Sequence, residues 1–207
     1  MKVPAPALAP PFSGAVLCGG ASRRMGRDKA LIAVDGRALA VRVADAVAAA
    51  GATQIVAVGG DLDALQAEGL AVVADADPGA GPLTGIVTAL AETGGDIVFV
   101  AACDLVAPSA EAIARTVRAL AADSDGDVAM PVVDGRRQWM HAAWRRRAGM
   151  PLAAAFAAGE RAVHAAVAAG CLRVVEVAVD AAAVADADAP SDLPTGRPPD
   201  LPGRASR

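Results

Sequence analysis

The residues best suited to chemistry lie in a glycine-rich, cationic segment near the start of the chain, residues 17–29. Gly19 and Gly20 would let the backbone approach a ligand and would offer N–H groups to phosphate oxygens. Arg23 and Lys29 bring positive charge to the same loop. The spacing matches neither the dinucleotide fingerprint GxGxxG nor the phosphate loop GxxxxGK[ST]. We therefore expect a phosphate-binding loop of another kind, with an ordinary glycine turn and solvated arginines as the alternative.

Carboxylates follow or flank other apolar runs. Asp104 ends one such run, and a carboxylate there suits Mg²⁺, which prefers hard oxygen ligands; a turn or capping role before Pro108 is the alternative. Asp75 follows another run in the same way. Asp186 and Asp188 are two residues apart and would share one side of an extended segment, unless they are solvated loop residues. Taken alone, Asp186 and Asp188 favour a solvated loop, and a metal and phosphate site is the alternative hypothesis for these carboxylates.

Alternating strands and helices must position these residues. Short apolar runs predict strands at Gly14–Cys18, Ile55–Val58, Leu70–Ala74, Asp96–Ala102, Val128–Met130, Trp139–Trp144 and Leu172–Val179. Helical patterns lie between them, at 38–50, 61–68, 82–93, 108–122, 149–158 and 160–168. Strands that are apolar on both faces indicate an α/β fold, with a mostly parallel sheet between two layers of helices. In such sheets ligands bind at the carboxyl ends of the strands, where the candidate residues lie.

Composition narrows the class of protein. A net charge of −4 and a pI near 5.1 argue against nucleic-acid binding, which usually needs a basic surface. The cysteines, Cys18, Cys103 and Cys171, are odd in number and form no CxxC pair, so we expect no disulfide framework, no zinc site and a cytoplasmic setting. We expect no signal peptide and no membrane span. The predicted organisation is a flexible leader over 1–12, one domain over 13–193 and a disordered tail over 194–207.

Taken together, the segments resemble the molybdenum cofactor guanylyltransferases. Leu17–Lys29 matches their opening, L-x-G-G-x-x-x-R-M-G-x-D-K, with one residue of length variation before the D-K. Gly81–Gly85 is similar to their G-P-L-x-G, and Cys103-Asp104 to their C-D. The resemblance covers residues 13–193 and implies a Rossmann-like nucleotidyltransferase fold. It also implies Mg²⁺-dependent transfer of GMP from GTP to the terminal phosphate of molybdenum-molybdopterin, with release of pyrophosphate.

The resemblance also implies roles for individual residues. Nucleotide binding would fall to Leu17, Cys18, Gly19, Gly20, Lys29, Asp75, Gly81 and Asp104. Catalysis would fall to Lys29, Asp104 and Arg23, and the metal to Asp104, with Asp186 or Asp188 as a candidate second ligand. The acceptor would be bound by Gly85, Arg161, Asp186 and Asp188. The expected partners are GTP, molybdopterin and, transiently, a molybdoenzyme or a cofactor-insertion protein, without nucleic acid or membrane.

Four positions depart from the family pattern. Val58 stands where an Asn often contacts the nucleoside, and Ala162 replaces a basic residue. The amides of the N-x-N-T-P pattern are carboxylates here, Asp186 and Asp188, which would repel a phosphate unless Mg²⁺ lies between them. His141 lies in a predicted strand. A position facing the acceptor is the less favoured alternative for its side chain. Use of CTP or of another phosphate acceptor, and a non-catalytic nucleotide-binding regulator, remain alternatives.

Overall fold

The structure is a computed structural model, and it describes residues 9–19 and 28–187. Its centre is an eight-stranded sheet. In spatial order the strands are β10 (Val174–Val177), β7 (Val128–Val133), β9 (His141–Arg145), β6 (Ile97–Ala102), β1 (Phe12–Leu17), β4 (Ala52–Val58) and β5 (Val72–Val73), and β8 (Arg136–Arg137) pairs with β7. A separate two-stranded hairpin is formed by β2 (Ala33–Val34) and β3 (Arg37–Ala38).

Most neighbouring strands are parallel, as predicted. Strands β6, β1, β4 and β5 run in one direction, and β7 and β10 run parallel to each other. Strand β9 is antiparallel to both of its neighbours, β6 and β7. After β1 the chain builds β4 and β5 on one side, and it then returns to β6 on the other side. The strand order therefore reverses between β1 and β6, which is where ligands bind in open parallel sheets.

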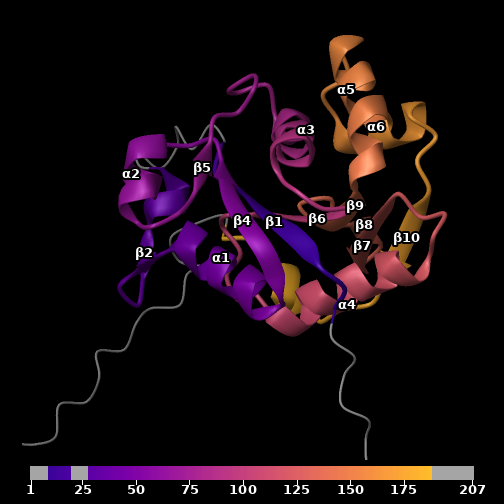
Figure 1. The fold of residues 1–207 in the computed structure, drawn as a ribbon. Helices are drawn as coiled ribbons and strands as arrows, with labels where there is room; N and C mark the ends of the chain where they lie inside the picture. The colour runs from indigo at the N-terminus through magenta and orange to yellow at the C-terminus, as the bar shows by residue number, and fades with distance from the viewer. Residues whose placement is uncertain (1–8, 20–27, 188–207) are drawn as a thin grey trace, which may run out of the picture.

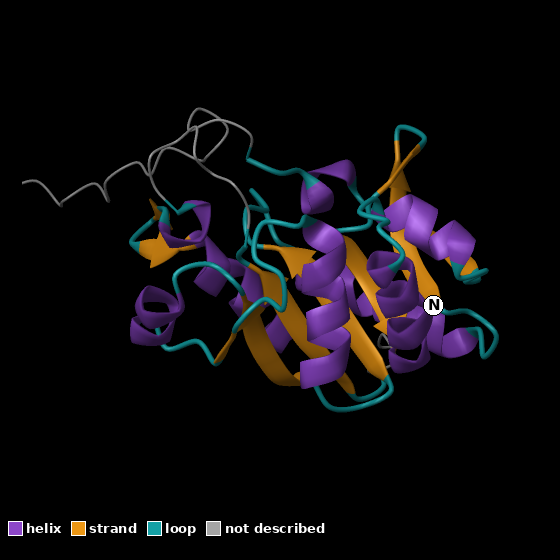
Figure 2. Ribbon diagram, turned by 90° about the horizontal axis from the view of Figure 1, so that it is seen from above, coloured by secondary structure: helices purple, strands orange, loops and turns teal. Residues whose placement is uncertain are grey.

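Helices cover both faces of the sheet (Figure 1). On one face lie α1 (Leu39–Ala49) and α4 (Ala110–Ala122), and on the other lie α3 (Pro82–Glu92), α5 (Gly149–Ala157) and α6 (Val163–Ala169). The short helix α2 (Leu62–Ala67) adds Leu65 to the core on the α1 and α4 side. Seen from above, helices lie across the strands of the sheet (Figure 2). The arrangement is the predicted three-layer αβα fold.

The alternation of side chains along the central strands explains the two layers. In β6, Val98 and Val100 face α3, whereas Phe99 packs on the side of α1 and α4. In β1, Leu17 faces α3 and Val16 the opposite layer. Successive side chains of a strand point to opposite faces, so a strand in the middle of the sheet must be apolar throughout.

The boundaries of the elements differ from the predictions in ways that local chemistry explains. The helix expected from Pro108 begins at Ala110, because the Ser109 side chain accepts a hydrogen bond from Ala112 N and caps it. Strand β1 begins at Phe12, which is fully buried and was expected in the leader. The hairpin at 33–38 was not predicted; its turn residues Asp35 and Gly36 both have positive φ, as a tight hairpin turn requires.

Two further expectations concern the ends of the chain and the membrane. The tail over 194–207 and most of the leader lie outside the described residues. Among the helices of residues 9–19 and 28–187, none is long and apolar enough to cross a membrane.

Candidate functional site

The candidate site forms where the carboxyl ends of β1, β4 and β6 meet. Leu17 is in register with Val58 of β4 and with Ala102 of β6. Just beyond the strands, Cys103 N donates a hydrogen bond to Leu17 O at 3.2 Å. The loop after β1 and the loop that carries Asp104 are therefore held side by side.

The loop after β1 is tied to β4 through its backbone. Cys18 N and Gly19 N both donate to Val58 O, at 2.9 and 3.2 Å. A Cβ built on Gly59 would lie 3.2 Å from Gly19 N, and Gly59 has φ +72°, so only glycine fits there without strain. The Gly19 N–H, which was expected to face a phosphate, is thus used inside the protein. Gly20 lies outside the described residues.

A lysine–carboxylate pair stands at the centre of the site. Lys29 Nζ lies 2.9 Å from Asp104 Oδ2 and also donates to Ala187 O at 2.7 Å. The two charged side chains are 20% and 18% exposed, so both are largely shielded and yet reachable. One contact joins the loop after β1 to the end of β6, and the other reaches the C-terminal segment. Arg23, the third expected catalytic residue, lies outside the described residues.

Asp28 holds this lysine in place, and the sequence analysis did not identify it. Its Oδ1 accepts from Ala30 N at 3.0 Å, and its Oδ2 accepts from Asp61 N at 3.1 Å. The first contact caps the 3-10 helix η2 (Lys29–Leu31), and the second attaches that helix to the start of α2. Aspartate is a preferred N-cap residue, so its place directly before the helix was the available signal.

Asp75 and the start of α3 form the next wall of the site. Thr84 Oγ1 donates to Asp75 Oδ1 at 2.8 Å, and a Cβ on Gly19 would lie 3.6 Å from Asp75 Oδ2. Gly81 has φ +102° directly before Pro82, the first residue of α3, so a glycine turn leads into the predicted helix. Asp75 therefore lies between the loop after β1 and this turn.

Several side chains expected in the site are buried beneath it. Leu17 is 6% exposed and packs toward α3, while Cys18 is 5% exposed and faces the opposite layer. A Cβ on Gly85 would lie 3.2 Å from Leu17 Cδ2, so this glycine lets α3 approach β1. Val58 is also buried, at 1% exposure, and it contributes its carbonyl oxygen rather than its side chain.

Cys103 adds no nucleophile. A hydrogen bond with Cys18, together with burial, raises the pKa of the Cys103 thiol well above its ordinary value. A thiol with a raised pKa stays protonated, and the thiolate is the nucleophilic form. The Cys103 thiol therefore does not supply a nucleophile to the site.

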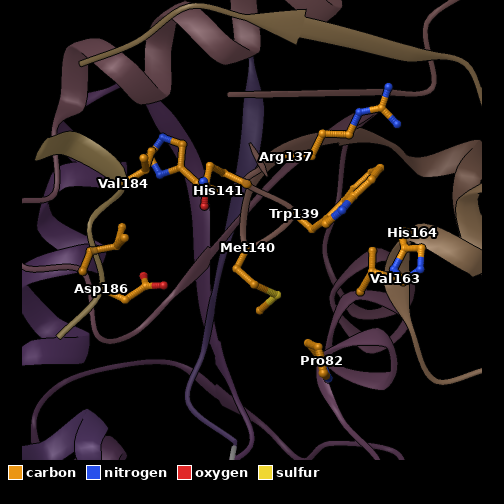
Figure 3. Close-up of a pocket in the computed structure, with 11 residues that line it drawn as sticks. Pro82, Arg137, Trp139, Met140, His141, Val163, His164, Val184 and Asp186 are labelled. Atoms are coloured by element: carbon orange, nitrogen blue, oxygen red, sulfur yellow. The ribbon is translucent and has the colours of Figure 1, made fainter. Parts of the chain in front are cut away.

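A cavity of about 280 Å³ lies beside this site (Figure 3). It lies between the β8–β9 segment, the starts of α3 and α6, and the C-terminal segment. The residues that line it are Pro82, Leu105, Arg137, Gln138, Trp139, Met140, His141, Val163, His164, Val184 and Asp186.

The C-terminal segment joins the cavity to Asp104. Leu105 and Asp186 form an isolated β-bridge, and Ala187 N donates to Asp104 O at 2.9 Å. Asp186, predicted at the acceptor or at the metal, therefore comes next to the Lys29–Asp104 pair and lines the cavity. Asp188 lies outside the described residues.

Arg161, also expected at the acceptor, lies between α5 and α6, and its carbonyl oxygen is 4.0 Å from a Cβ built on Gly81. Its guanidinium donates to Phe156 O and Glu160 O, at 2.9 and 2.8 Å, and lies over the Phe156 ring at 4.0 Å. These contacts close the turn between α5 and α6. The start of α6, including Val163 and His164, lines the cavity instead.

The site has the donor type that Mg²⁺ needs. Mg²⁺ is usually held by one or two carboxylates together with substrate phosphates and water. Asp104 offers one partly exposed carboxylate at the strand end. Within residues 9–19 and 28–187 no three His, Cys, Asp or Glu side chains gather into a complete metal cage. The residues fit an ion that arrives with a phosphate substrate.

Comparison with known proteins agrees with this geometry. The sequence model for the MobA-like NTP transferase domain matches residues 14–177. A molybdenum cofactor guanylyltransferase from Shewanella frigidimarina is 34% identical over 139 residues, which cover 61% of this chain and 69% of that protein. Alignments with the next two curated relatives span about half of those proteins, 49% and 45%.

Two solved structures show the same fold. The molybdopterin-guanine dinucleotide biosynthesis protein A from Archaeoglobus fulgidus has a TM-score of 0.68 and 22% identity, covering 87% of this chain and 94% of that chain. The 2-C-methyl-D-erythritol 4-phosphate cytidylyltransferase from Thermus thermophilus has a TM-score of 0.63 and 18% identity, covering 86% and 94%. The match of the family's sequence model runs from β1 to β10, and the chain therefore belongs to the family of MobA-like NTP transferase domains.

Proposed function

We propose that this protein transfers GMP from GTP to the terminal phosphate of molybdopterin, forming molybdopterin guanine dinucleotide and pyrophosphate. The observation that carries the proposal is the Lys29–Asp104 pair at the switch point of the sheet, 2.9 Å apart, beside a cavity that can receive a second substrate. The related guanylyltransferases support the choice of donor and acceptor.

The charge of the reactants determines what the site must do. An oxygen of the acceptor phosphate attacks the α-phosphorus of the nucleotide, the bond to the β-phosphate breaks, and pyrophosphate leaves. Both reactants are anionic, so the protein must neutralise charge and align them. The Lys29 ammonium stands where the triphosphate would need compensation, and Asp28 fixes its position. Arg23 in the same loop is proposed to assist.

We also propose that the reaction depends on Mg²⁺ held by Asp104. When bound, the ion would supply positive charge that reduces the repulsion between the two anionic substrates. Asp104 is already oriented by Lys29 and by the backbone contact between Asp104 O and Ala187 N, at 2.9 Å. The protein thus contributes a fixed carboxylate rather than a complete cage.

Recognition of the nucleoside is assigned to Asp75 and the turn at Gly81. Asp75 faces Gly19 across the loop, and its other oxygen is occupied by Thr84. Use of CTP is a second candidate, because a cytidylyltransferase has the same fold. We place the reaction in the cytoplasm, because GTP is abundant there and Cys18, Cys103 and Cys171 are free. Transient contact with the molybdoenzyme or insertion protein that receives the product is part of the proposal.

Pyrophosphate release tests this function. Purified protein is mixed with Mg²⁺, molybdopterin and each of the four nucleoside triphosphates in turn. We expect release with GTP only, and none when molybdopterin is omitted. Release with CTP in preference to GTP would replace the assigned donor, and nucleotide binding without any release would indicate a regulator.

A further inference from the structure

The cavity beside Asp104 is lined by both apolar and polar side chains. Six of its eleven lining residues are aliphatic or aromatic, and the other five, Arg137, Gln138, His141, His164 and Asp186, carry polar groups. The apolar contributors are Pro82, Leu105, Trp139, Met140, Val163 and Val184. At about 280 Å³ the cavity lies at the small end of ligand pockets, which run from roughly 300 to 1,000 Å³. A space of this size, with both apolar walls and polar groups, suits one flat ring system.

Trp139 is the aromatic side chain on this wall. It is half-buried, and its ring lies 6.2 Å from the fully buried ring of Trp144, at an angle of 31°. The Arg137 guanidinium lies 5.9 Å from the Trp139 ring centre and is itself held by Glu176. The indole is therefore positioned before any ligand arrives. An indole at the wall of a small cavity is well suited to stacking on a planar heteroaromatic ring.

Asp186 supplies the directional contact. Figure 3 shows it across the cavity from Trp139. Its backbone is fixed by the bridge to Leu105 and by the hydrogen bond from Val106 N to Ala185 O, at 2.9 Å. A carboxylate accepts two parallel N–H groups well. The 2-amino-4-oxopyrimidine edge of a pterin presents such a pair, and a sugar phosphate does not.

His141 adds a neutral polar group to the same lining. It is 1% exposed, and neither ring nitrogen has a hydrogen-bond partner among the described residues. Its ring packs edge-on against Phe99 at 4.9 Å. Burial lowers the pKa of His141 to about 4, so the ring is uncharged at neutral pH. A buried neutral imidazole beside the cavity is compatible with an uncharged ring system.

Resting on the proposed function, we propose that this cavity binds the pterin ring of the acceptor, with Trp139 stacking on it and Asp186 pairing with its amino-pyrimidinone edge. Guanine carries the same edge, so the ring of GTP is the competing occupant. The pterin is favoured because the loop after β1 and Asp75 lie on the β4 and β5 side of Asp104, whereas the cavity lies on the β9 side. Trp139 and Asp186 would then determine which acceptor the protein accepts.

Fluorescence of Trp139 reports on occupancy directly. The chain has two tryptophans, so Trp144→Phe leaves Trp139 as the sole emitter. Titration with 6-hydroxymethylpterin should quench this emission to saturation, and GMP at equal concentration should neither quench it nor compete. Asp186→Ala in the same background should weaken pterin binding about 10- to 100-fold, the scale of a charge-assisted pair. If Trp144→Phe fails to fold, calorimetric titration of the wild-type protein and Asp186→Ala gives the same comparison.

Measurements of KM provide a second test of the proposal. Trp139→Ala should raise KM for molybdopterin about 5- to 100-fold while KM for GTP stays the same, and Trp139→Phe should restore most of the loss. Arg136→Ala, on the exposed strand β8 outside the cavity lining, is the matched control. Quenching by GMP, or a rise in KM for GTP, would overturn the proposal by giving the cavity to the nucleotide. Absence of wild-type turnover with GTP and molybdopterin would instead overturn the proposed function, and the binding titration would still decide the occupant.

Discussion

The donor side and the acceptor side of the site are built differently. On the donor side, Lys29 reaches a carboxylate 75 residues away and a carbonyl 158 residues away in sequence. Glycines there bring backbones within contact distance, as at Gly59 and Gly19. On the acceptor side, the cavity is lined by six apolar and five polar residues, and one of the polar ones, His141, is buried without a hydrogen-bond partner among the described residues.

The difference matches two kinds of chemical work. Neutralising phosphates needs fixed charge and close backbone, which few residue types provide. Choosing an acceptor ring needs shape and a small number of directional contacts, which many residue combinations provide. Under the proposed function, the donor side therefore sets the reaction, and the acceptor side sets the substrate. Variants on the two sides should separate these roles.

The largest expected effect is on the donor side. Lys29→Ala or Asp104→Ala should lower kcat/KM for pyrophosphate release. The activation free energy should rise by at least ~3 kcal/mol, the scale of losing one preorganised electrostatic contact. The reason is that each variant breaks the 2.9 Å pair at the switch point. Arg37→Ala, which breaks the exposed pair between Arg37 and Asp45, is the control and should leave the rate unchanged. Near-normal release from both donor-side variants would place the reaction elsewhere.

The second effect concerns the close packing of Gly60 against Cys18 and Asp28. Gly60 has φ +78°, and a Cβ there would lie 3.1 Å from Cys18 Cβ and 3.2 Å from Asp28 Oδ2. Gly60→Ala should therefore lower the free energy of unfolding by about 2–4 kcal/mol, combining left-handed strain with crowding. Turnover should fall as well, because Asp28 positions Lys29.

Gly36 offers a matched control for this variant. It has φ +77° and no atom within 4 Å of a built Cβ, so Gly36→Ala adds the strain alone, about 1–2 kcal/mol. Chemical denaturation measures both losses. Equal losses in the two variants would show that crowding at the donor loop is unimportant. Pterin binding should survive in both, since neither residue lines the cavity.

Sequence reasoning recovered the donor side better than the acceptor side, for a physical reason. Apolar runs that end at Leu17 and Asp104 predicted neighbouring strand ends, and parallel topology then brings their loops together. The same reasoning did not show that the Leu17 side chain is packed beneath the site, or that Gly85 lies against it. A motif identifies which residues occur at a loop, whereas burial decides which atoms reach its surface.

The acceptor side could not be assembled in advance because five separate segments line it. Trp139 reads equally well as a core aromatic residue, and its half-exposed position depends on β9 beginning at His141. The reversed direction of β9, between β6 and β7, is a tertiary outcome that local pattern does not contain. The contacts of the Arg161 guanidinium with Phe156 O and Glu160 O likewise depend on how α5 ends, which the sequence pattern does not specify.

A third prediction tests the neutral histidine of the acceptor side. Burial lowers the pKa of His141 from 6.5 to about 4, so the unfolded chain binds a proton more readily than the folded protein. Its contribution to stability is then fully present above about pH 6.5 and is lost as pH falls toward 4. Between pH 7 and pH 5 the loss should be about 2 kcal/mol, or roughly 4–8 °C in Tm.

His141→Leu should remove this component of the acid sensitivity. Thermal melts at pH 7 and pH 5 compare the wild-type protein with His141→Leu and with His164→Leu, a variant of the exposed histidine of the same cavity. The Tm difference between the two pH values should shrink in the first variant only. An unchanged difference in His141→Leu would mean that this histidine is solvated and charged in the folded protein.

The smallest expected effect decides to which side the C-terminal carboxylates belong. Asp186 lines the cavity, so Asp186→Asn should raise KM for molybdopterin while the Mg²⁺ concentration for half-maximal rate stays constant. We propose that Asp188 serves the metal, and Asp188→Asn should raise that Mg²⁺ concentration about two- to fivefold, the scale of one solvated charge interaction. The double variant carries the neutral amides of the family pattern and should show both changes together, because the two carboxylates would act on different partners. A Mg²⁺ shift produced by Asp186→Asn alone would move Asp186 from the acceptor to the donor side, and would leave Trp139 as the remaining support for the cavity's occupant.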